Sequence, residues 1–334
     1  MKILLYFEGE ELISKSGVGR AYDHQKTALE AAGVAYTTDP RCKDYDILHI
    51  NTYGINSVTM VHNARRMNKK VIYHAHSTEE DFRNSFTLSN VISPFIKQWL
   101  IGLYKQADML ITPTSYSRGI LERYGLNQPI RVISNGIDLD RFRRSEAKAK
   151  AFREYFHFSE DDKVVLGVGL LFHRKGLPDF VKVAKMMPDY KFVWFGDISR
   201  FIIPVEISEL VENPPANVIF PGYIAGEIIE GAYSAASCFF FPSYEETEGI
   251  VVLEALASGC PVLVRDIGAF RPWLVDGYNC HKAVSNDGFV QKIRMITEGR
   301  AADTTANGMV TAEERSITRI GEQLRDAYET VLRG

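Results

Sequence analysis

Two glutamates with seven residues between them, Glu246 and Glu254, are the side chains whose spacing points most directly to chemistry. They lie in a segment, 241–261, where a predicted strand ends, a polar loop follows and a helix begins near Gly249. Glu246 in the loop and Glu254 about a turn and a half into the helix could therefore face one cleft. A carboxylate there can accept two hydrogen bonds from vicinal hydroxyls of a ribose or hexose.

Two backbone segments could bind phosphate. The helix that begins near Gly249 and Ile250 would present N–H groups at its start, which make an anion site for a diphosphate. A second segment, with Gly17, Gly19 and Arg20, follows the first predicted strand and precedes a helix. Its flexible backbone could approach a phosphate or a transferred sugar, and a simple tight turn is the alternative.

Short apolar runs alternate with helical patterns along the chain. The strands predicted in the first half are 2–7, 47–50, 71–73, 109–111 and 130–133. A second alternating series begins at 164. Such alternation predicts an α/β fold of two Rossmann-like domains, each with a parallel sheet covered on both faces. Ligands are expected beyond the carboxyl ends of the strands, in a cleft between the domains.

A charged stretch, 138–162, interrupts the alternation and predicts a linker that leads into a surface helix. We therefore expect a first domain at 1–145 and a second at 146–315. The last helix, within 316–334, has apolar residues at helical spacing and is expected to pack back toward the first domain.

Composition bounds the class of protein. The chain is 46% hydrophobic and 24% charged, which is typical of a soluble globular protein. No apolar run approaches the roughly 18 to 20 residues of a membrane-spanning helix, so we expect a cytoplasmic protein or one held at a membrane surface. Residues 1–150 contain 21 Lys and Arg against 16 Asp and Glu, and the remainder contains 18 against 26. This imbalance indicates a first domain that faces an anionic partner, and ordinary surface variation is the alternative.

The 241–261 segment resembles the Glu-x7-Glu motif of the family 4 retaining glycosyltransferases. The match includes the Glu-Ala-x-Ala-x-Gly-x-Pro tail, present here at 254–261. The resemblance implies a GT-B fold, with two parallel sheets facing across an interdomain cleft, and a nucleotide-sugar donor. Glu248 departs from the pattern, because members of the family usually have an apolar or aromatic residue there.

A second match, 169–176, resembles the family's Gly-Arg-Leu…Lys-Gly loop, whose Arg and Lys clamp the diphosphate and stabilise the leaving group. Lys175 matches directly, whereas Leu170 stands at the usual Arg position. Arg174 or Arg20 is therefore expected to supply the second positive charge. Gly196 lies in a strand-end turn that resembles one approaching the nucleotide.

In enzymes that this chain resembles, a histidine lies beside the transferred sugar, and register favours His76 over His74; a structural role for both is the alternative. Members of the class use no protein nucleophile, so His76 would support the sugar and its oxocarbenium-like charge. No metal-binding motif is present, and lysine and arginine would replace the metal at the leaving group. Mg²⁺ is thus not required by any motif, although it could stimulate.

Nearly the whole chain resembles bacterial glycosyl-diacylglycerol synthases. The similar stretches include 6–10, 49–54, 74–86 and 241–248. The resemblance implies hexose transfer from UDP-glucose or UDP-galactose to monoglucosyl-diacylglycerol, which gives an α-linked diglycosyl lipid used in glycolipids and lipoteichoic acid anchors. The sequence does not distinguish the two donors.

An apolar stripe supports the expectation that the protein binds to the inner face of the cell membrane. It comprises Ile92, Phe95, Ile96, Trp99, Leu100, Leu103 and Tyr104, flanked by Lys97 and Lys105. A basic run, 65–70, lies nearby in the sequence. Both could rest on an anionic bilayer, and the alternative is a helix face packed on the sheet.

Other functions stay open. The acceptor could be diacylglycerol itself, or a soluble or cell-wall saccharide. A nucleotide-sugar-binding regulator on the same fold would need a broken site, which Glu254, Lys175 and His76 argue against. A dehydrogenase is disfavoured because the first turn lacks a full Gly-x-Gly-x-x-Gly. No feature of the sequence indicates a nucleic-acid partner.

Overall fold

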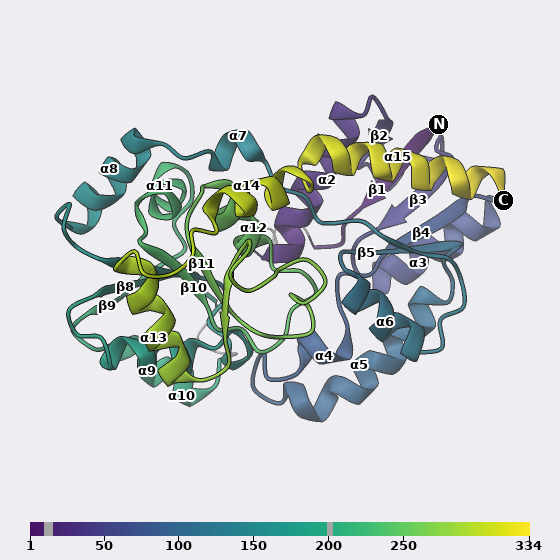
Figure 1. Ribbon diagram of the computed structural model, residues 1–334. Helices are drawn as coiled ribbons and strands as arrows, with labels where there is room; N and C mark the ends of the chain where they lie inside the picture. The colour runs from purple at the N-terminus through teal and green to yellow at the C-terminus, as the bar shows by residue number, and fades with distance from the viewer. Residues whose placement is uncertain (10–15, 199–202) are drawn as a thin grey trace. The chain divides into compact units, whose positions relative to one another are not determined.

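The computed structural model describes residues 1–9, 16–198 and 203–334 (Figure 1). Glu10, part of one of the similar stretches above, lies outside these described residues. The chain divides into two compact units. The first contains Met1–Phe82, Asn90–Ile137 and Arg315–Gly334, and the second contains Arg83–Ser89 and Asp138–Glu314.

The first unit contains a six-stranded parallel sheet of order β2-β1-β3-β4-β5-β6. Its strands are β1 (Lys2–Tyr6), β2 (Ala35–Thr37), β3 (Ile47–Ile50), β4 (Lys70–His74), β5 (Met109–Thr112) and β6 (Ile130–Val132). The connecting helices are α2 (Gly17–Ala31), α3 (Ile55–Arg66), α4 (Glu79–Phe82), α5 (Ser89–Tyr104) and α6 (Ser115–Arg123). The last helix, α15 (Ile317–Arg333), packs beside α2.

Both faces of this sheet are covered, because successive side chains of a strand point to opposite faces. Ile3 and Leu5 of β1 pack with residues of α2 and α15 in one core cluster. Leu4 and Tyr6 pack in a second cluster, with residues of α3, α5 and α6. The near-continuous apolar strands follow from burial on two sides.

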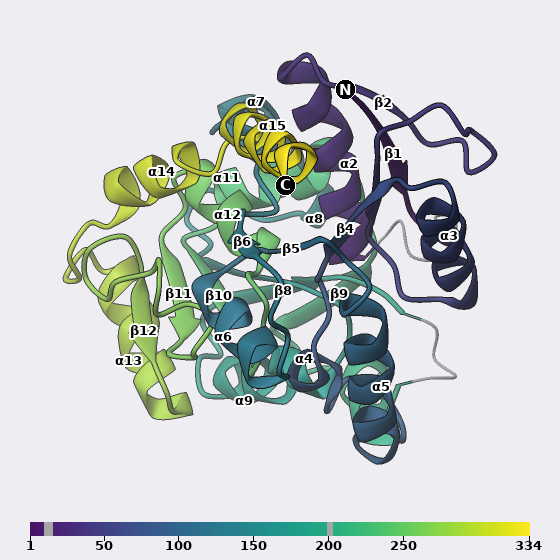
Figure 2. The same ribbon diagram turned by 90° about the vertical axis from the view of Figure 1, so that its right-hand side faces the viewer.

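The second unit repeats the plan with a parallel sheet of order β12-β11-β10-β7-β8-β9. Its strands are β7 (Val164–Val168), β8 (Lys191–Phe195), β9 (Val218–Gly222), β10 (Cys238–Phe241), β11 (Val262–Arg265) and β12 (His281–Ala283). Its α-helices are α7 (Leu139–Phe142), α8 (Glu146–Phe156), α9 (Leu177–Lys185), α10 (Val205–Glu212), α11 (Glu227–Ala235), α12 (Ile250–Ala257), α13 (Asn286–Thr297) and α14 (Thr305–Glu313), and a 3₁₀ turn spans His173–Lys175. Figure 2 shows the same elements from a second direction.

Both sheets place their strands in parallel, so the carboxyl ends of all strands in one unit lie along one edge. The predicted site residues lie in the segments that follow β1 and β4 in the first unit, and in those that follow β7, β8 and β10 in the second. Within residues 1–9, 16–198 and 203–334, every helix is too short or too polar to cross a lipid bilayer.

Gly196, at the end of β8, is fixed by a close approach of backbone. Its φ is +142°, and a Cβ added there would lie 1.9 Å from the Gly169 carbonyl oxygen. No side chain fits in that space unless the turn after β7 moves.

We therefore expect Gly196→Ala to lower the free energy of unfolding by at least about 2 kcal/mol, from backbone strain and the clash with Gly169. Urea unfolding would measure this change. Gly119→Ala is the control: Gly119 lies in α6, and its added Cβ would meet nothing closer than Arg123 Nη1 at 3.7 Å. That change should stabilise by up to about 1 kcal/mol. Equal stabilities of the two variants would contradict the interpretation.

Candidate functional site

A buried ion pair joins the loops after β7 and β10. Lys175 Nζ lies 2.5 Å from Glu246 Oε1, and the Ser243 hydroxyl donates to the same oxygen at 2.7 Å. Lys175 ends the 3₁₀ turn, and the next residue, Gly176, begins the entry to α9 at φ +76°. The polar loop after β10 supplies Ser243 and Glu246, so the strand order that pairs β7 with β10 brings the two loops together.

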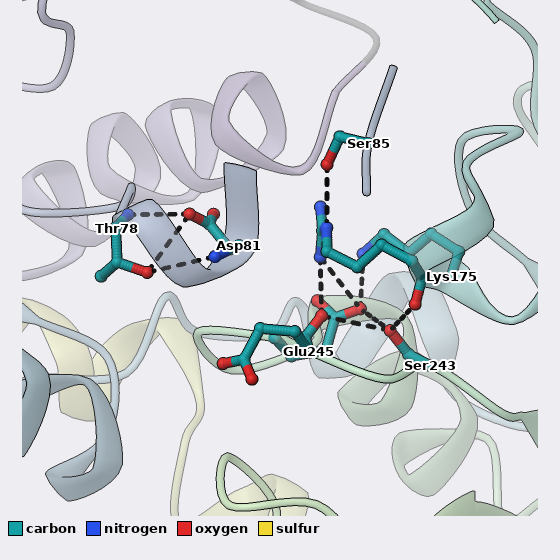
Figure 3. Close-up of polar contacts among 8 residues, drawn as sticks. Thr78, Asp81, Ser85, Lys175, Ser243 and Glu245 are labelled. Atoms are coloured by element: carbon teal, nitrogen blue, oxygen red, sulfur yellow. Dashed lines mark hydrogen bonds and ion pairs between the residues drawn. The ribbon is translucent and has the colours of Figure 1, made fainter. Parts of the chain in front are cut away.

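Arg174 lies beside this pair and ties three segments of the second unit. Its Nε donates to Ser85 Oγ at 3.0 Å, and its Nη1 donates to the Glu245 carbonyl oxygen at 2.6 Å. Nη1 also lies 3.8 Å from Glu246 Oε1. Figure 3 draws these contacts as dashed lines, with Ser85, Lys175, Ser243 and Glu245 labelled. Arg174 thus adds positive charge to the site and also fixes the loop that carries Glu246.

Two opposing effects set the ionisation of Glu246. Burial acts to raise its pKa, but the charges of Lys175 and Arg174 and the hydrogen bonds from Lys175 and Ser243 outweigh burial. The net pKa is below the ordinary value, so Glu246 is a carboxylate at neutral pH. The site therefore contains two cations and one anion in a region that water reaches poorly.

Glu254 is buried in α12, where the hydroxyl of Tyr233 donates to its Oε2 at 2.6 Å. It is the fifth residue of that helix, as the sequence predicts. At the helix start, Gly249 has φ +91°, and no side chain caps the helix at Gly249. Ile250 is the first helical residue. The Val252 N–H donates to the Gly249 carbonyl oxygen at 2.9 Å, so the N–H groups of Ile250 and Val251 are the ones at this helix start that could meet an anion.

A cavity of about 250 Å³ lies beyond the ends of β7, β8 and β9. Its lining includes Gly196 and Asp197 after β8, and Phe220, Pro221 and Gly222 at the end of β9. Leu171 and Ile203 add apolar surface. Gly196 and Gly222 contribute no side chain to its lining.

In the glycine loop of the first unit, some backbone N–H groups are already engaged in hydrogen bonds within the loop and helix α2. Ser16 caps α2, and its hydroxyl accepts from the Gly19 N–H at 3.2 Å. The Arg20 N–H donates to the Ser16 carbonyl oxygen at 3.0 Å. Gly17 is the first residue of α2, and a Cβ added there would meet no atom of the described residues 1–9, 16–198 and 203–334 within 4 Å.

Three histidine rings stack at the carboxyl ends of β3 and β4. The His74 and His76 rings are 4.0 Å apart and nearly parallel, and the His49 and His74 rings are 5.4 Å apart. His76 Nε2 lies 2.9 Å from Asn51 Oδ1, which also accepts from Gln25 Nε2 at 2.8 Å. Because Oδ1 can only accept, His76 carries its proton on Nε2.

Burial keeps these rings neutral. It lowers the pKa of His49 to about 3, with a small contribution from His76, and lowers the pKa of His76 to about 3 against a hydrogen bond with Asn135. The pKa of His74 is also well below 6.5, from burial and then from the neighbouring His76 and His49. His76 thus acts as a polar, uncharged group.

The structure brings Arg174, Lys175 and Glu246 into direct contact and places Gly249, Ile250 and Glu254 on one helix. Gly17, Gly19, Arg20 and His76 belong to the first unit. Four residues that position the predicted side chains through hydrogen bonds were not identified from the sequence. They are Ser243, Tyr233, Asn51 and Gln25. Within the described ranges, no three His, Cys, Asp or Glu side chains are grouped as metal ligands.

Comparison with known proteins gives matches along the chain. The family model described as glycosyl transferases group 1 matches residues 149–310, and that described as glycosyltransferase family 4 matches residues 28–141. The chain is 44% identical over 336 residues to the processive diacylglycerol alpha-glucosyltransferase of Acholeplasma laidlawii, covering 100% of this chain and 99% of the relative.

Two further matches are more distant. The alpha-galactosylglucosyldiacylglycerol synthase of Streptococcus pneumoniae is 23% identical over 275 residues, which cover 80% of this chain and 73% of the relative. The crystal structure of Anabaena HepE in complex with UDP-glucose matches with a TM-score of 0.79 and 17% identity, over 99% of this chain and 100% of that one. The structural likeness shows a shared fold.

The histidine stack predicts a pH-dependent stability. An unfolded histidine has a pKa near 6.5, so below that pH the unfolded chain binds protons that His49, His74 and His76 exclude when folded. The free energy of unfolding should therefore fall as pH falls from 6.5 toward 3. For three groups the loss between pH 6.5 and 5.5 is on the order of 3 kcal/mol.

Urea unfolding at several pH values would measure this slope. His74→Gln should make the slope shallower, whereas the control His62→Gln, on the exposed face of α3, should leave it unchanged. An unfolding midpoint that is constant between pH 7 and 5.5 would show that these rings protonate freely in the folded protein.

Proposed function

Because the chain belongs to the family 4 glycosyltransferases, we propose that it transfers glucose from UDP-glucose to a diacylglycerol-based acceptor with retention of configuration. The family and the enzyme class predicted from the Glu-x7-Glu motif are confirmed. The observation that carries the proposal is the 44% identity, along the whole chain, to a diacylglycerol alpha-glucosyltransferase.

For the acceptor we favour monoglucosyl-diacylglycerol, which would give an α-linked diglucosyl lipid. Diacylglycerol itself is the second candidate, because the Acholeplasma relative is named as a processive diacylglycerol glucosyltransferase. A processive enzyme would use its first product as its second acceptor. We favour glucose over galactose as the donor sugar because the same relative is named as a glucosyltransferase.

The second unit supplies the groups that the donor needs. We assign the diphosphate to Lys175, Arg174 and the first turn of α12 at Gly249 and Ile250, where positive charge and N–H groups stabilise the departing UDP. An ammonium has three N–H donors, so Lys175 can bind Glu246 and a phosphate oxygen together.

The second unit also has groups that could bind the ribose and the uracil of the donor. We assign the ribose to Glu254, whose carboxylate is oriented by Tyr233, and the uracil to the cavity lined by Gly196 and the end of β9. Glu246 would bind hydroxyls of the transferred glucose. For the first unit taken by itself, we keep for His76 the sugar-supporting role that the family resemblance implies. No protein nucleophile is needed, since the acceptor attacks on the face that UDP leaves and the diphosphate takes the proton.

Radiolabelled UDP-glucose and UDP-galactose, each with monoglucosyl-diacylglycerol or diacylglycerol in mixed anionic micelles, test this proposal. We expect label from UDP-glucose in a diglucosyl lipid. Lys175→Ala should lower transfer by at least about 100-fold, since it removes charge stabilisation of the leaving group. Lys185→Ala, on α9, is the control and should retain activity. Label only in free sugar would reject the lipid acceptor, and full activity of Lys175→Ala would reject the donor site.

We further propose that α5 rests on an anionic membrane surface. Val91 is 66% exposed, Phe95 76% and Trp99 43%, whereas Leu100 and Leu103 of the predicted stripe are buried. The stripe is therefore divided: its second half packs on the sheet, and its first half presents apolar surface. In the basic run, Arg65 is paired with Asp108 at 2.9 Å, so the apolar half of α5 is the better target for mutation.

Val91→Ser combined with Phe95→Ser should weaken binding to phosphatidylglycerol vesicles by at least about tenfold, because two exposed apolar side chains lose their transfer into lipid. Vesicle co-sedimentation measures this change. The control is Val310→Ser with Tyr155→Ser, which alters two exposed apolar residues of the second unit. If both pairs bind vesicles alike, the membrane-facing surface lies elsewhere.

A further inference from the structure

Helix α5 differs on its two sides. Val91, Phe95 and part of the Trp99 ring are exposed. The other side donates hydrogen bonds to the loops that follow β3 and β4. These are the loops that carry Asn51 and His76, so the helix proposed to meet the membrane is also bonded to the predicted sugar-binding edge of the first sheet.

Trp99 belongs to both sides. Its ring contributes to the exposed apolar surface, and its Nε1–H donates to the Tyr53 carbonyl oxygen at 2.7 Å. Tyr53 lies two residues after Asn51, in the short loop between β3 and α3. An indole is suited to this role, because it has an apolar body and a single polar N–H.

A second bond from α5 reaches the neighbouring loop. The Tyr104 hydroxyl donates to the Ser77 carbonyl oxygen at 2.9 Å, and Ser77 follows His76 directly. The two loops are thus held to α5 by Trp99 and Tyr104, and the bond between His76 and Asn51 joins them to each other.

These contacts form a closed ring. Asn51 and Tyr53 lie on one loop, and Tyr53 is bonded to Trp99 of α5. Tyr104, further along α5, is bonded to Ser77 of the second loop, next to His76. The hydrogen bond from His76 Nε2 to Asn51 Oδ1 closes the ring. In such a network the bonds are coupled, so a change at the Trp99 bond can reach the His76 ring through Tyr53 and Asn51.

We infer that Trp99 is a positioning residue. Its hydrogen bond fixes the loop after β3, and through that loop His76, relative to the membrane-facing surface of α5. The inference rests on the proposed function, since it gives that function a link between the lipid surface and the sugar site. It separates two properties of one side chain: the ring surface serves membrane binding, and the N–H serves turnover.

Trp99→Phe distinguishes these properties, because it keeps an aromatic ring and removes the N–H. With saturating phosphatidylglycerol vesicles, monoglucosyl-diacylglycerol and labelled UDP-glucose, we expect kcat to fall about fivefold, the value of one hydrogen bond, with vesicle binding and the KM for UDP-glucose unchanged. Tyr104→Phe, which removes the companion bond, should lower kcat in the same direction.

Trp273→Phe is the matched control. It makes the same chemical change in the second unit, where Trp273 Nε1–H donates to the Ala269 carbonyl oxygen at 3.0 Å, and it should leave kcat unchanged. Amide hydrogen exchange at 51–54 and 76–79 supplies a readout that does not depend on transfer. Exchange there should be faster in Trp99→Phe than in the wild type or in Trp273→Phe.

Wild-type kcat and wild-type exchange in Trp99→Phe would overturn the inference. A loss of turnover that follows a loss of vesicle binding would overturn it as well, because the ring surface would then explain the effect. If the wild-type protein transfers no label to lipid, the proposed function fails, and the exchange measurement still decides whether Trp99 orders the two loops.

Discussion

A buried carboxylate between two cations is the constraint on which the second unit depends. Glu246 is 6% exposed and Arg174 9%, so neither charge is hydrated as it would be in water. Removing a charge from water costs several kcal/mol unless partners replace the lost hydration. Here Lys175 and Ser243 replace it for Glu246, and Ser85 and the Glu245 carbonyl oxygen replace it for Arg174. The loops after β7 and β10 are thereby fixed together.

The backbone of the same two loops is also fixed by close contacts. A Cβ added at Gly176 would lie 2.3 Å from the Pro242 carbonyl oxygen, so the entry to α9 can pass the end of β10 only at a glycine. Arg265 Nε donates to that carbonyl oxygen at 2.9 Å, and Arg265 Nη2 contacts Asp179 at 2.7 Å. The turn that carries Lys175 and the loop that carries Glu246 are therefore held from two directions, which keeps a charged site rigid before any ligand arrives.

Much of this arrangement could be predicted from the sequence, because it depends on local patterns. The apolar strands, the helix that contains Glu254 and the GT-B fold are confirmed, since each depends on periodicity or on a motif. Strand β2 was missed because it has three residues and none is buried. The bond from Arg174 to Ser85 joins residues 89 positions apart, and no pattern near either residue indicates it. Periodicity also identified the stripe on α5 but could not show that Leu100 packs inward while Phe95 is exposed.

The candidate residues of the two units differ in electrostatic character. His76 has a pKa of about 3 and carries its proton toward Asn51, so it cannot offer a positive charge to a departing diphosphate at neutral pH. Lys175 and Arg174 are the cationic side chains of the candidate site, and both lie within 4 Å of the ionised Glu246. We therefore propose charge stabilisation as the task of Lys175 and Arg174 in the second unit, and the orientation of hydroxyl groups as the task of the neutral histidine stack in the first.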